Sequence, residues 1–221
     1  MRNAVIDVYW SANSPFCWRV LLTLELKGLA WRSHPMQTDL QAHKAPQMLA
    51  MNPRGRLPVV KDGDYVVFES LAVLYYLDRK YPSPPIFGQS AEEGGVIMRV
   101  INEFQAYTEE GLMRILRELQ TATPRLGEAL TRAMYTVASE ARTVEGRLGK
   151  GEWIVGDSVS AADLAIYPCI RLLHRALMRP EAQELAARFL PVEVHYPQTA
   201  RWLRRVESLF KPSFVESMDP K

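Results

Sequence analysis

The feature that most constrains the fold is a proline-rich segment at residues 81–88, YPSPPIFG, where the hydrophobic periodicity of the chain changes. Three prolines and one glycine within so few residues are typical of a linker. Before this segment, short β-rich runs alternate with helical patterns, and after it the pattern is helical. The sequence therefore predicts an α/β domain over residues 1–82, a linker over 83–90 and an all-helical domain over 91–221.

The first domain is predicted to follow the order β-α-β-α-β-β-α. The expected elements are strands at 4–9 and 30–36, helices at 15–27, 41–51 and 70–80, and two short strands joined at Asp62-Gly63. A βαβ beginning makes the first two strands parallel, whereas the tight turn adds antiparallel strands. Gly28 stands just past the first helix, where a glycine commonly ends one.

The second domain carries apolar residues at helical spacing. This spacing predicts helices through residues 97–115 and 130–148, a third beginning near Ser160 and a fourth over about 197–209. Ser160 and Asp163 have the spacing of a capping box, in which each side chain satisfies a backbone amide of the other. Asp163 is therefore predicted to be structural, although it is a carboxylate beside an apolar run.

Composition excludes several classes of protein. The 221 residues include 27 Lys and Arg against 25 Asp and Glu, a balance that argues against nucleic acid or a membrane surface as the partner. Two cysteines are too few for a disulfide scaffold, so a reducing, cytoplasmic location is expected. We find no signal-peptide pattern and no apolar run long enough to span a membrane, and we expect no metal site.

The segment Ser14-Pro15-Phe16-Cys17 follows the first expected strand and carries the first candidate chemistry. Pro15 suits the first position of a helix, which places Ser14 at the N-cap. Its hydroxyl could cap the helix, or it could donate to an anion held at the helix end. Cys17 stands where the second cysteine of a redox Cys-x-x-Cys would stand, so it is either a small buried hydrophobe or a redox-active thiol.

Four segments together carry a resemblance to a known family. They are SPFCWRV, NPRGRLPVV, FESLAVLYYLDRKYP and VGDSVSAADLAIYP, and their order and spacing span essentially the whole chain. On these segments the chain resembles the cytosolic glutathione transferases, which have a thioredoxin-like N-terminal domain and an all-helical C-terminal domain. The first segment is most similar to the serine-type classes, zeta-like, with tau- and omega-like features in Ser-Pro-Phe.

The resemblance implies a role for each motif. Ser14 would donate a hydrogen bond to the thiolate of glutathione, the co-substrate, and would be the catalytic residue. Pro58 would be cis, and the backbone of Val59 would pair with the cysteinyl unit. Ser70 would bind the γ-glutamyl carboxylate through its hydroxyl and amide, and Glu69 would pair with the ammonium.

The glycyl carboxylate of glutathione requires a cation. Arg56 is the first candidate and Lys44 the second, with Arg54 and His43 in the same region. The resemblance also implies a homodimer and a pocket between the domains for a hydrophobic electrophile.

The predicted activity is transfer of glutathione to an electrophilic small molecule, as in detoxification. The alternatives are a glutathione-dependent isomerase resembling maleylacetoacetate isomerase, a thiol-disulfide or deglutathionylating enzyme that uses Cys17, and a non-catalytic binding module of the same fold.

Overall fold

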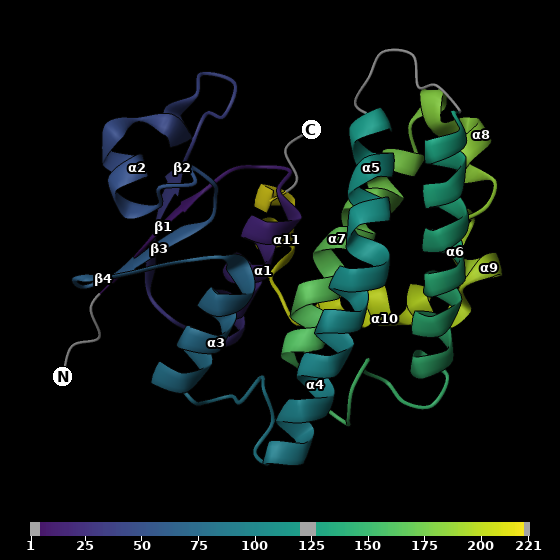
Figure 1. The fold of residues 1–221 in the computed structure, drawn as a ribbon. Coiled ribbons are helices and arrows are strands. Elements are labelled where there is room, and N and C mark those ends of the chain that lie inside the picture. Colours follow the sequence, from purple (N-terminus) through teal and green to yellow (C-terminus); the bar gives the residue numbers. More distant parts are fainter. Residues whose placement is uncertain (1–4, 120–126, 219–221) are drawn as a thin grey trace. The chain divides into compact units, whose positions relative to one another are not determined.

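The computed structural model describes residues 5–119 and 127–218 and divides into two compact units (Figure 1). The first unit comprises Met1–Pro85 and Leu209–Lys221, and the second comprises Ile86–Ser208. This division groups the last helix, α11 (Pro212–Met218), with the first unit, whereas the sequence-based boundaries place it in the helical domain.

The first unit is built on a four-stranded sheet in the order β2-β1-β3-β4. Its strands are β1 (Ile6–Trp10), β2 (Trp31–Pro35), β3 (Val59–Asp62) and β4 (Tyr65–Phe68). β1 pairs in parallel with β2 and antiparallel with β3, and β3 pairs antiparallel with β4, as the βαβ beginning and the turn predict. Asp62 pairs with Tyr65, so the turn residues are Gly63 and Asp64, one position beyond the expected Asp62-Gly63. Ala4, at the start of the first expected strand, lies outside the described residues.

Three helices and one short 3-10 turn accompany the sheet. They are α1 (Pro15–Leu26), η1 (Ala42–Lys44), α2 (Pro46–Met51) and α3 (Ser70–Lys80). Figure 1 shows α1 and α3 on one side of the sheet and α2 on the other, and α1 packs directly against α3. The single helix expected over 41–51 is split before Pro46, because proline lacks the amide hydrogen that a continuing helix requires.

A buried lysine fixes the end of the first unit. The ammonium of Lys27 lies 2.9 Å from the Asp78 carboxylate and donates to the carbonyls of Tyr81 and Pro84 at 2.8 and 2.6 Å. An ammonium group has three donors, and all three are satisfied here. The proline-rich segment is therefore anchored to α1 and α3.

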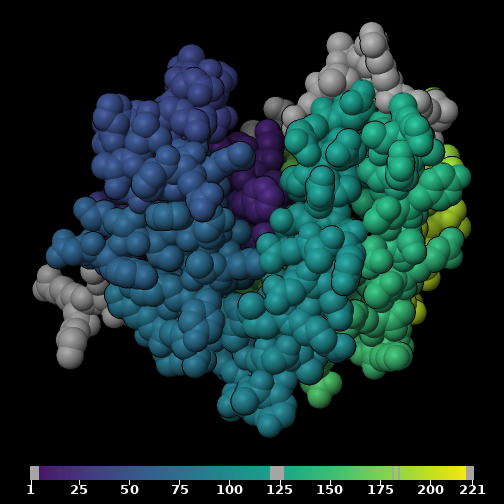
Figure 2. All heavy atoms as spheres, in the orientation of Figure 1, coloured from purple at the N-terminus to yellow at the C-terminus, as the bar shows by residue number. Residues whose placement is uncertain are grey.

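The second unit is helical throughout its described residues. Its elements are α4 (Ala91–Phe104), the π-helical η2 (Gln105–Glu109), α5 (Glu110–Leu119), α6 (Glu128–Leu148), α7 (Ala161–Leu177), η3 (Pro180–Ala182), α8 (Gln183–Ala186), α9 (Val192–His195) and α10 (Pro197–Ser208). α5 and α6 pack side by side, and in Figure 2 their teal and green side chains lie against each other. The long helix expected through 97–115 begins earlier and is interrupted by η2. The short elements after α7 were not predicted, because they are too short to show a period.

The capping box at the start of α7 is confirmed. Ser160 is the N-cap and accepts from the Ala162 amide at 3.2 Å. The carboxylate of Asp163 accepts from the Ser160 amide and hydroxyl at 2.9 Å each, from the Ile154 amide at 3.1 Å and from Trp202 Nε1 at 2.8 Å. Burial raises the pKa of Asp163, and these four donors oppose that rise. Asp163 therefore connects the start of α7 to the preceding segment and to α10 by hydrogen bonds, and its role is structural.

Candidate active site

The N-terminus of α1 forms the first part of the candidate site. Ser14 is its N-cap, with extended backbone dihedrals, and the Ser14 hydroxyl accepts from the Cys17 amide at 3.3 Å. Pro15 occupies the first helical position, as predicted. Ser14 is partly exposed, so its hydroxyl combines a capping bond with access to solvent.

The helix end also lacks a compensating negative charge. The first turn of α1 contains no acidic residue, whereas the first turns of α4 and α7 contain Glu92, Glu93 and Asp163. Uncompensated amides at a helix N-terminus carry partial positive charge and favour an anion. This end of α1 therefore has the electrostatics of an anion site.

Cys17 lies in the core beneath the cap. Its side chain is 0% exposed, and its sulfur accepts from the Ser11 amide at 3.4 Å. Burial raises the pKa of the Cys17 thiol, although the Ser14 and Ser11 hydroxyls oppose that rise. A redox-active cysteine is accessible and has a lowered pKa, so the structure supports the packing interpretation of Cys17. Cys169 is also free and buried.

The N-terminus of α3 forms the second part of the candidate site. Glu69 is the N-cap, with a positive φ of 67° and no capping bond from its side chain, and α3 begins at Ser70. Ser70 is thus the first helical residue, as the helix predicted over 70–80 requires. Its buried hydroxyl accepts from the Arg19 guanidinium at 3.4 Å, so the hydroxyl proton stays available for an incoming acceptor.

Arg19 links the two helix ends and was not identified as a site residue from the sequence. It is only 1% exposed, and its guanidinium carbon lies 5.0 Å from the centre of the Phe16 ring. That separation is within the range of a cation–π contact. From the sequence alone, an arginine on a helix is usually interpreted as a surface charge. Only the packing of α1 against α3 shows that Arg19 is buried between the two helices.

The segment Leu57-Pro58-Val59 lies between α2 and β3. The Leu57–Pro58 peptide is cis, as the resemblance implies. Val59 is fully buried and is aligned with Tyr9 on one side and with Phe68 on the other. The backbone amide and carbonyl of Leu57 have no hydrogen-bond partner among the described residues, so Leu57 offers the backbone groups that a ligand could pair with.

A buried asparagine shapes the preceding loop. Asn52 is 1% exposed, donates to the Arg56 carbonyl at 2.9 Å and accepts from the Arg54 amide at 3.1 Å. Gly55, with φ of 53°, lies close to Lys44, whose ammonium donates to the Arg54 carbonyl at 3.2 Å. The loop therefore brings the cationic side chains to one region.

The cations differ in how far they are already paired. Arg54 lies 4.0 Å from the Glu69 carboxylate, and both side chains are exposed. Arg56 is exposed and has no carboxylate within ion-pair distance in the described part of the chain. Nδ1 of His43 is buried without a hydrogen-bond partner among these residues. The Arg56 guanidinium and Nδ1 of His43 are thus two groups of this region that no side chain of the described residues engages.

Neither a metal-binding cluster nor a membrane-spanning helix occurs among the described residues. Within residues 5–119 and 127–218, no group of three or more His, Cys, Asp or Glu side chains could hold a metal ion. None of the helices described in these ranges is long and apolar enough to cross a membrane.

Comparison with known proteins decides the family. Residues 13–80 match the model described as "Glutathione S-transferase, N-terminal domain", and residues 127–205 match the model of the C-terminal domain. The chain is 32% identical over 156 residues to glutathione S-transferase F9 of Arabidopsis thaliana, covering 68% of this chain and 73% of that protein. The chain belongs to the glutathione S-transferase family. Maleylacetoacetate isomerase of Pseudomonas aeruginosa is 27% identical over 74% of this chain and 79% of its own.

Solved structures of this family share the fold. Poplar glutathione transferase F1 superposes with a TM-score of 0.80 at 21% identity, covering 98% of this chain and 97% of its own. A glutathione transferase of Burkholderia graminis, solved with two glutathione molecules bound per subunit, gives 0.81 at 24% identity and covers 97% and 88%. The predicted architecture, a thioredoxin-like unit and a helical unit, is confirmed.

Proposed function

We propose that this member of the family is a glutathione transferase that binds glutathione at the helix ends of its first unit, ionises the thiol and transfers the sulfur to an electrophile. The observation that carries the proposal is the N-terminus of α1, where Ser14 caps the helix and no acidic side chain occupies the first turn. A free thiol has a pKa of about 8.5, and the field of a helix N-terminus favours its anion.

Ser14 acts in this proposal as a donor to the thiolate, which makes the enzyme serine-type. Its oxygen already accepts from the Cys17 amide, so the hydroxyl proton is the group left for a ligand. The polar neighbour competing for that proton is the Cys17 sulfur, a weak acceptor compared with a thiolate. The thiolate then attacks an electrophilic carbon, forms the C–S bond and displaces the leaving group with its electron pair.

The remaining contacts would hold the tripeptide. Ser70 binds the γ-glutamyl carboxylate through its hydroxyl and amide, and Glu69 pairs with the ammonium. Val59 was the first candidate for pairing with the cysteinyl unit, and the unpaired backbone of Leu57 supports Leu57 as the closer choice. Arg56 remains the first candidate for the glycyl carboxylate.

Lys44 and His43 are the further candidates at that carboxylate. The buried, unpartnered Nδ1 of His43 supports giving it a larger part than the sequence suggests, because a carboxylate would satisfy it. The proposal also includes a hydrophobic electrophile and a homodimer. A cytoplasmic location is included as well, since both cysteines are free, as in a reducing compartment.

Isomerisation is a second candidate function, favoured by the similarity to maleylacetoacetate isomerase. The same thiolate would add to a conjugated double bond, allow rotation and then leave, so glutathione would be regenerated. Assays with a chlorodinitrobenzene-type electrophile and with maleylacetoacetate separate the two activities.

The binding mode is tested by calorimetry with glutathione and with S-hexylglutathione. We expect Ser70→Ala and Arg56→Ala each to weaken binding about 5- to 100-fold, because each removes a hydrogen bond to a charged group. Asp157→Ala, an exposed acidic position in the second unit, is the control and should bind as the native chain does. If both ligands fail to bind the native chain, the proposed function is wrong.

A further inference from the structure

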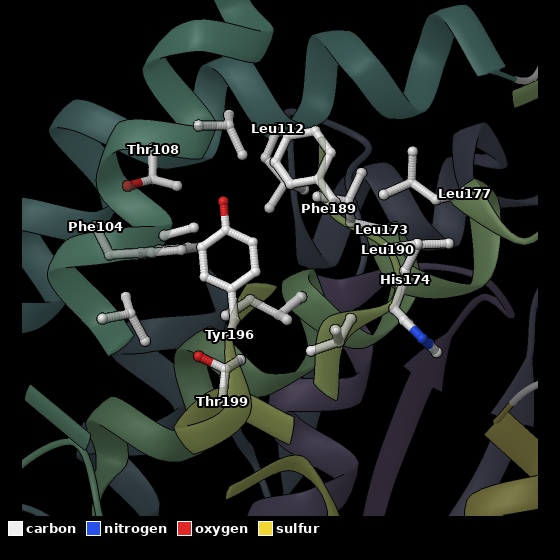
Figure 3. Close-up of a pocket in the computed structure, with 15 residues that line it drawn as sticks. Phe104, Thr108, Leu112, Leu173, His174, Leu177, Phe189, Leu190, Tyr196 and Thr199 are labelled. Carbon is white, nitrogen blue, oxygen red and sulfur yellow. The ribbon is translucent and has the colours of Figure 1, made fainter. Parts of the chain in front are cut away.

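The second unit contains a partly open apolar cavity that the proposed transferase reaction does not use. Its volume is about 60 Å³, and its wall is drawn from α4, η2, α5, α6, α7, α9, α10 and the segment before α9. The lining side chains are shown in Figure 3 and are mostly Leu, Val, Ile and Phe. Empty apolar cavities of this kind bind small apolar molecules in other proteins.

The hydroxyl of Tyr196 is a polar group of this wall that is directed into the cavity. Tyr196 is 6% exposed, and among residues 5–119 and 127–218 nothing forms a hydrogen bond with its hydroxyl. Figure 3 shows this hydroxyl pointing into the cavity, on the side where Thr108 and Leu112 lie. The Tyr196 hydroxyl is not itself fully buried, so a water-sized group can reach it, and its orientation points to the place where a ligand oxygen would bind.

The other polar side chains of the wall are engaged or turned aside. The Thr199 hydroxyl donates to the Glu145 carboxylate at 2.8 Å, which also accepts from the Gln198 and Thr199 amides at the start of α10. His174 lies at the edge, with its ring directed away from Tyr196 in Figure 3. Tyr196 is therefore the group best placed to orient a ligand.

The backbone of the wall is irregular at this point. Thr108 belongs to the π-helical segment η2, which interrupts α4 and α5 where they border the cavity. Single π-helical turns inside α-helices occur frequently at functional sites, because the wider turn redirects side chains. This observation is independent of the unpartnered hydroxyl and points to the same place.

We propose that this cavity is a second ligand site, which takes a small apolar molecule bearing one oxygen that exchanges a hydrogen bond with Tyr196. The cavity volume of about 60 Å³ limits the ligand to a small molecule. A short-chain alcohol such as 1-butanol matches both the size and the single polar group. The inference does not rest on the proposed transferase function, since every lining residue belongs to the second unit.

The test is a methyl NMR titration of the full-length chain with 1-butanol and, separately, with xenon. We expect both probes to shift the methyl signals of Leu112, Leu173 and Leu177 saturably. Tyr196→Phe should weaken 1-butanol binding about 3- to 10-fold, the value of one hydrogen bond, and leave xenon binding unchanged.

Filling the cavity provides the matched control. Ala141 lines the cavity on α6, whereas Ala138 lies on the same helix outside the lining. Ala141→Leu should abolish the saturable shifts, and Ala138→Leu should retain them. If Ala141→Leu does not fold, Val144→Leu fills the same space from the next turn.

Three results would overturn the proposal. They are the absence of saturable shifts in the native chain, equal 1-butanol affinity in Tyr196→Phe, and retained shifts in the filled variant. Glutathione binding measured on the same samples should be equal in all variants, so a failure of this site is distinguishable from a failure of the transferase proposal.

Discussion

Among the described residues, α1, α4 and α7 each begin with a serine N-cap, and the serines of α1 and α7 are in opposite situations. Ser160 at α7 accepts from the Ala162 amide and donates to the Asp163 carboxylate, so both functions of its hydroxyl are used inside the fold. Ser14 at α1 accepts from the Cys17 amide and has no carboxylate beside it. The residue at the third helical position, Asp163 in one case and Cys17 in the other, decides whether the hydroxyl proton is available.

In the proposed function, a serine N-cap stabilises the fold at α7 and takes part in catalysis at α1. A complete capping box satisfies the amides of the helix end and leaves no attraction for an external anion. A cap without the acidic partner satisfies one amide and leaves the positive end of the helix unopposed. We therefore propose the incomplete cap of α1 as the place where the glutathione sulfur binds.

The largest expected effect is at the complete cap. Asp163→Ala should lower the free energy of unfolding by about 3 kcal/mol or more, because four buried donors lose their acceptor. Urea unfolding followed by circular dichroism measures it. Asp157→Ala, in the exposed loop before the cap, is the control and should change little. A small decrease in the free energy of unfolding for Asp163→Ala would mean that these hydrogen bonds contribute little to the stability of the helical unit.

The second-largest effect is expected at Ser14, in the incomplete cap, and should be a loss of catalytic activity. Ser14→Ala should reduce kcat/KM with a chlorodinitrobenzene-type electrophile about 100-fold, the typical value of one donor to a developing anion. The free energy of unfolding of Ser14→Ala should fall by only about 1 kcal/mol, the typical contribution of an N-cap hydrogen bond. Ser160→Ala is the matched control, with a loss of stability and unchanged kcat/KM. Unchanged kcat/KM in Ser14→Ala would remove the proposed role of the hydroxyl.

The pH dependence of catalysis should also differ between variants at Ser14 and at Ser160. A donor to the thiolate favours its charged form and lowers the pKa of the bound thiol, so removing the donor raises that pKa toward about 8.5. The alkaline rise of kcat against pH should therefore move to higher pH in Ser14→Ala and stay in place in Ser160→Ala. An unmoved profile would show that the helix end alone sets the thiol pKa.

The smallest effect is expected at the third position of α1. Cys17→Ala should retain transferase activity and lose about 1 kcal/mol of stability, because a small buried group is removed. Cys169→Ala, the other buried cysteine, is the control and should behave alike. A specific loss of disulfide-reducing activity in Cys17→Ala would restore the redox interpretation.

The sequence predicted the frame of the first unit well. The position of Pro15 and Gly28 bounded α1, and the glycine turn placed β3 and β4, because these residues restrict the backbone directly. The same local signals identified Ser160 and Asp163 as a cap. Some features of the structure were not predicted, such as the π-helical interruption after Phe104. No residue that restricts the backbone marks such an interruption in the sequence.

The candidate site was only partly predictable for a related reason. Ser14 and Ser70 stand at predicted helix starts, and the resemblance to the family implied their roles and that of Glu69. Arg19 and Asn52 act through neighbours distant in sequence or through loop carbonyls, so nothing local marks them. Leu57 could be preferred to Val59 only after the strand pairing was known.

By itself, the sequence determined where this chain forms helices and strands, where its two parts separate and which helix ends carry a serine. These properties depend on backbone restrictions and hydrophobic period, which act over a few residues. Only the tertiary structure decided which polar groups are already engaged: the Ser160 hydroxyl by Asp163, the Lys27 ammonium by Asp78 and two carbonyls, and the Tyr196 hydroxyl by none of the described residues. Hydrogen bonds and burial depend on neighbours that folding brings together. The polar groups that are still able to bind a ligand could therefore be identified only in the folded chain.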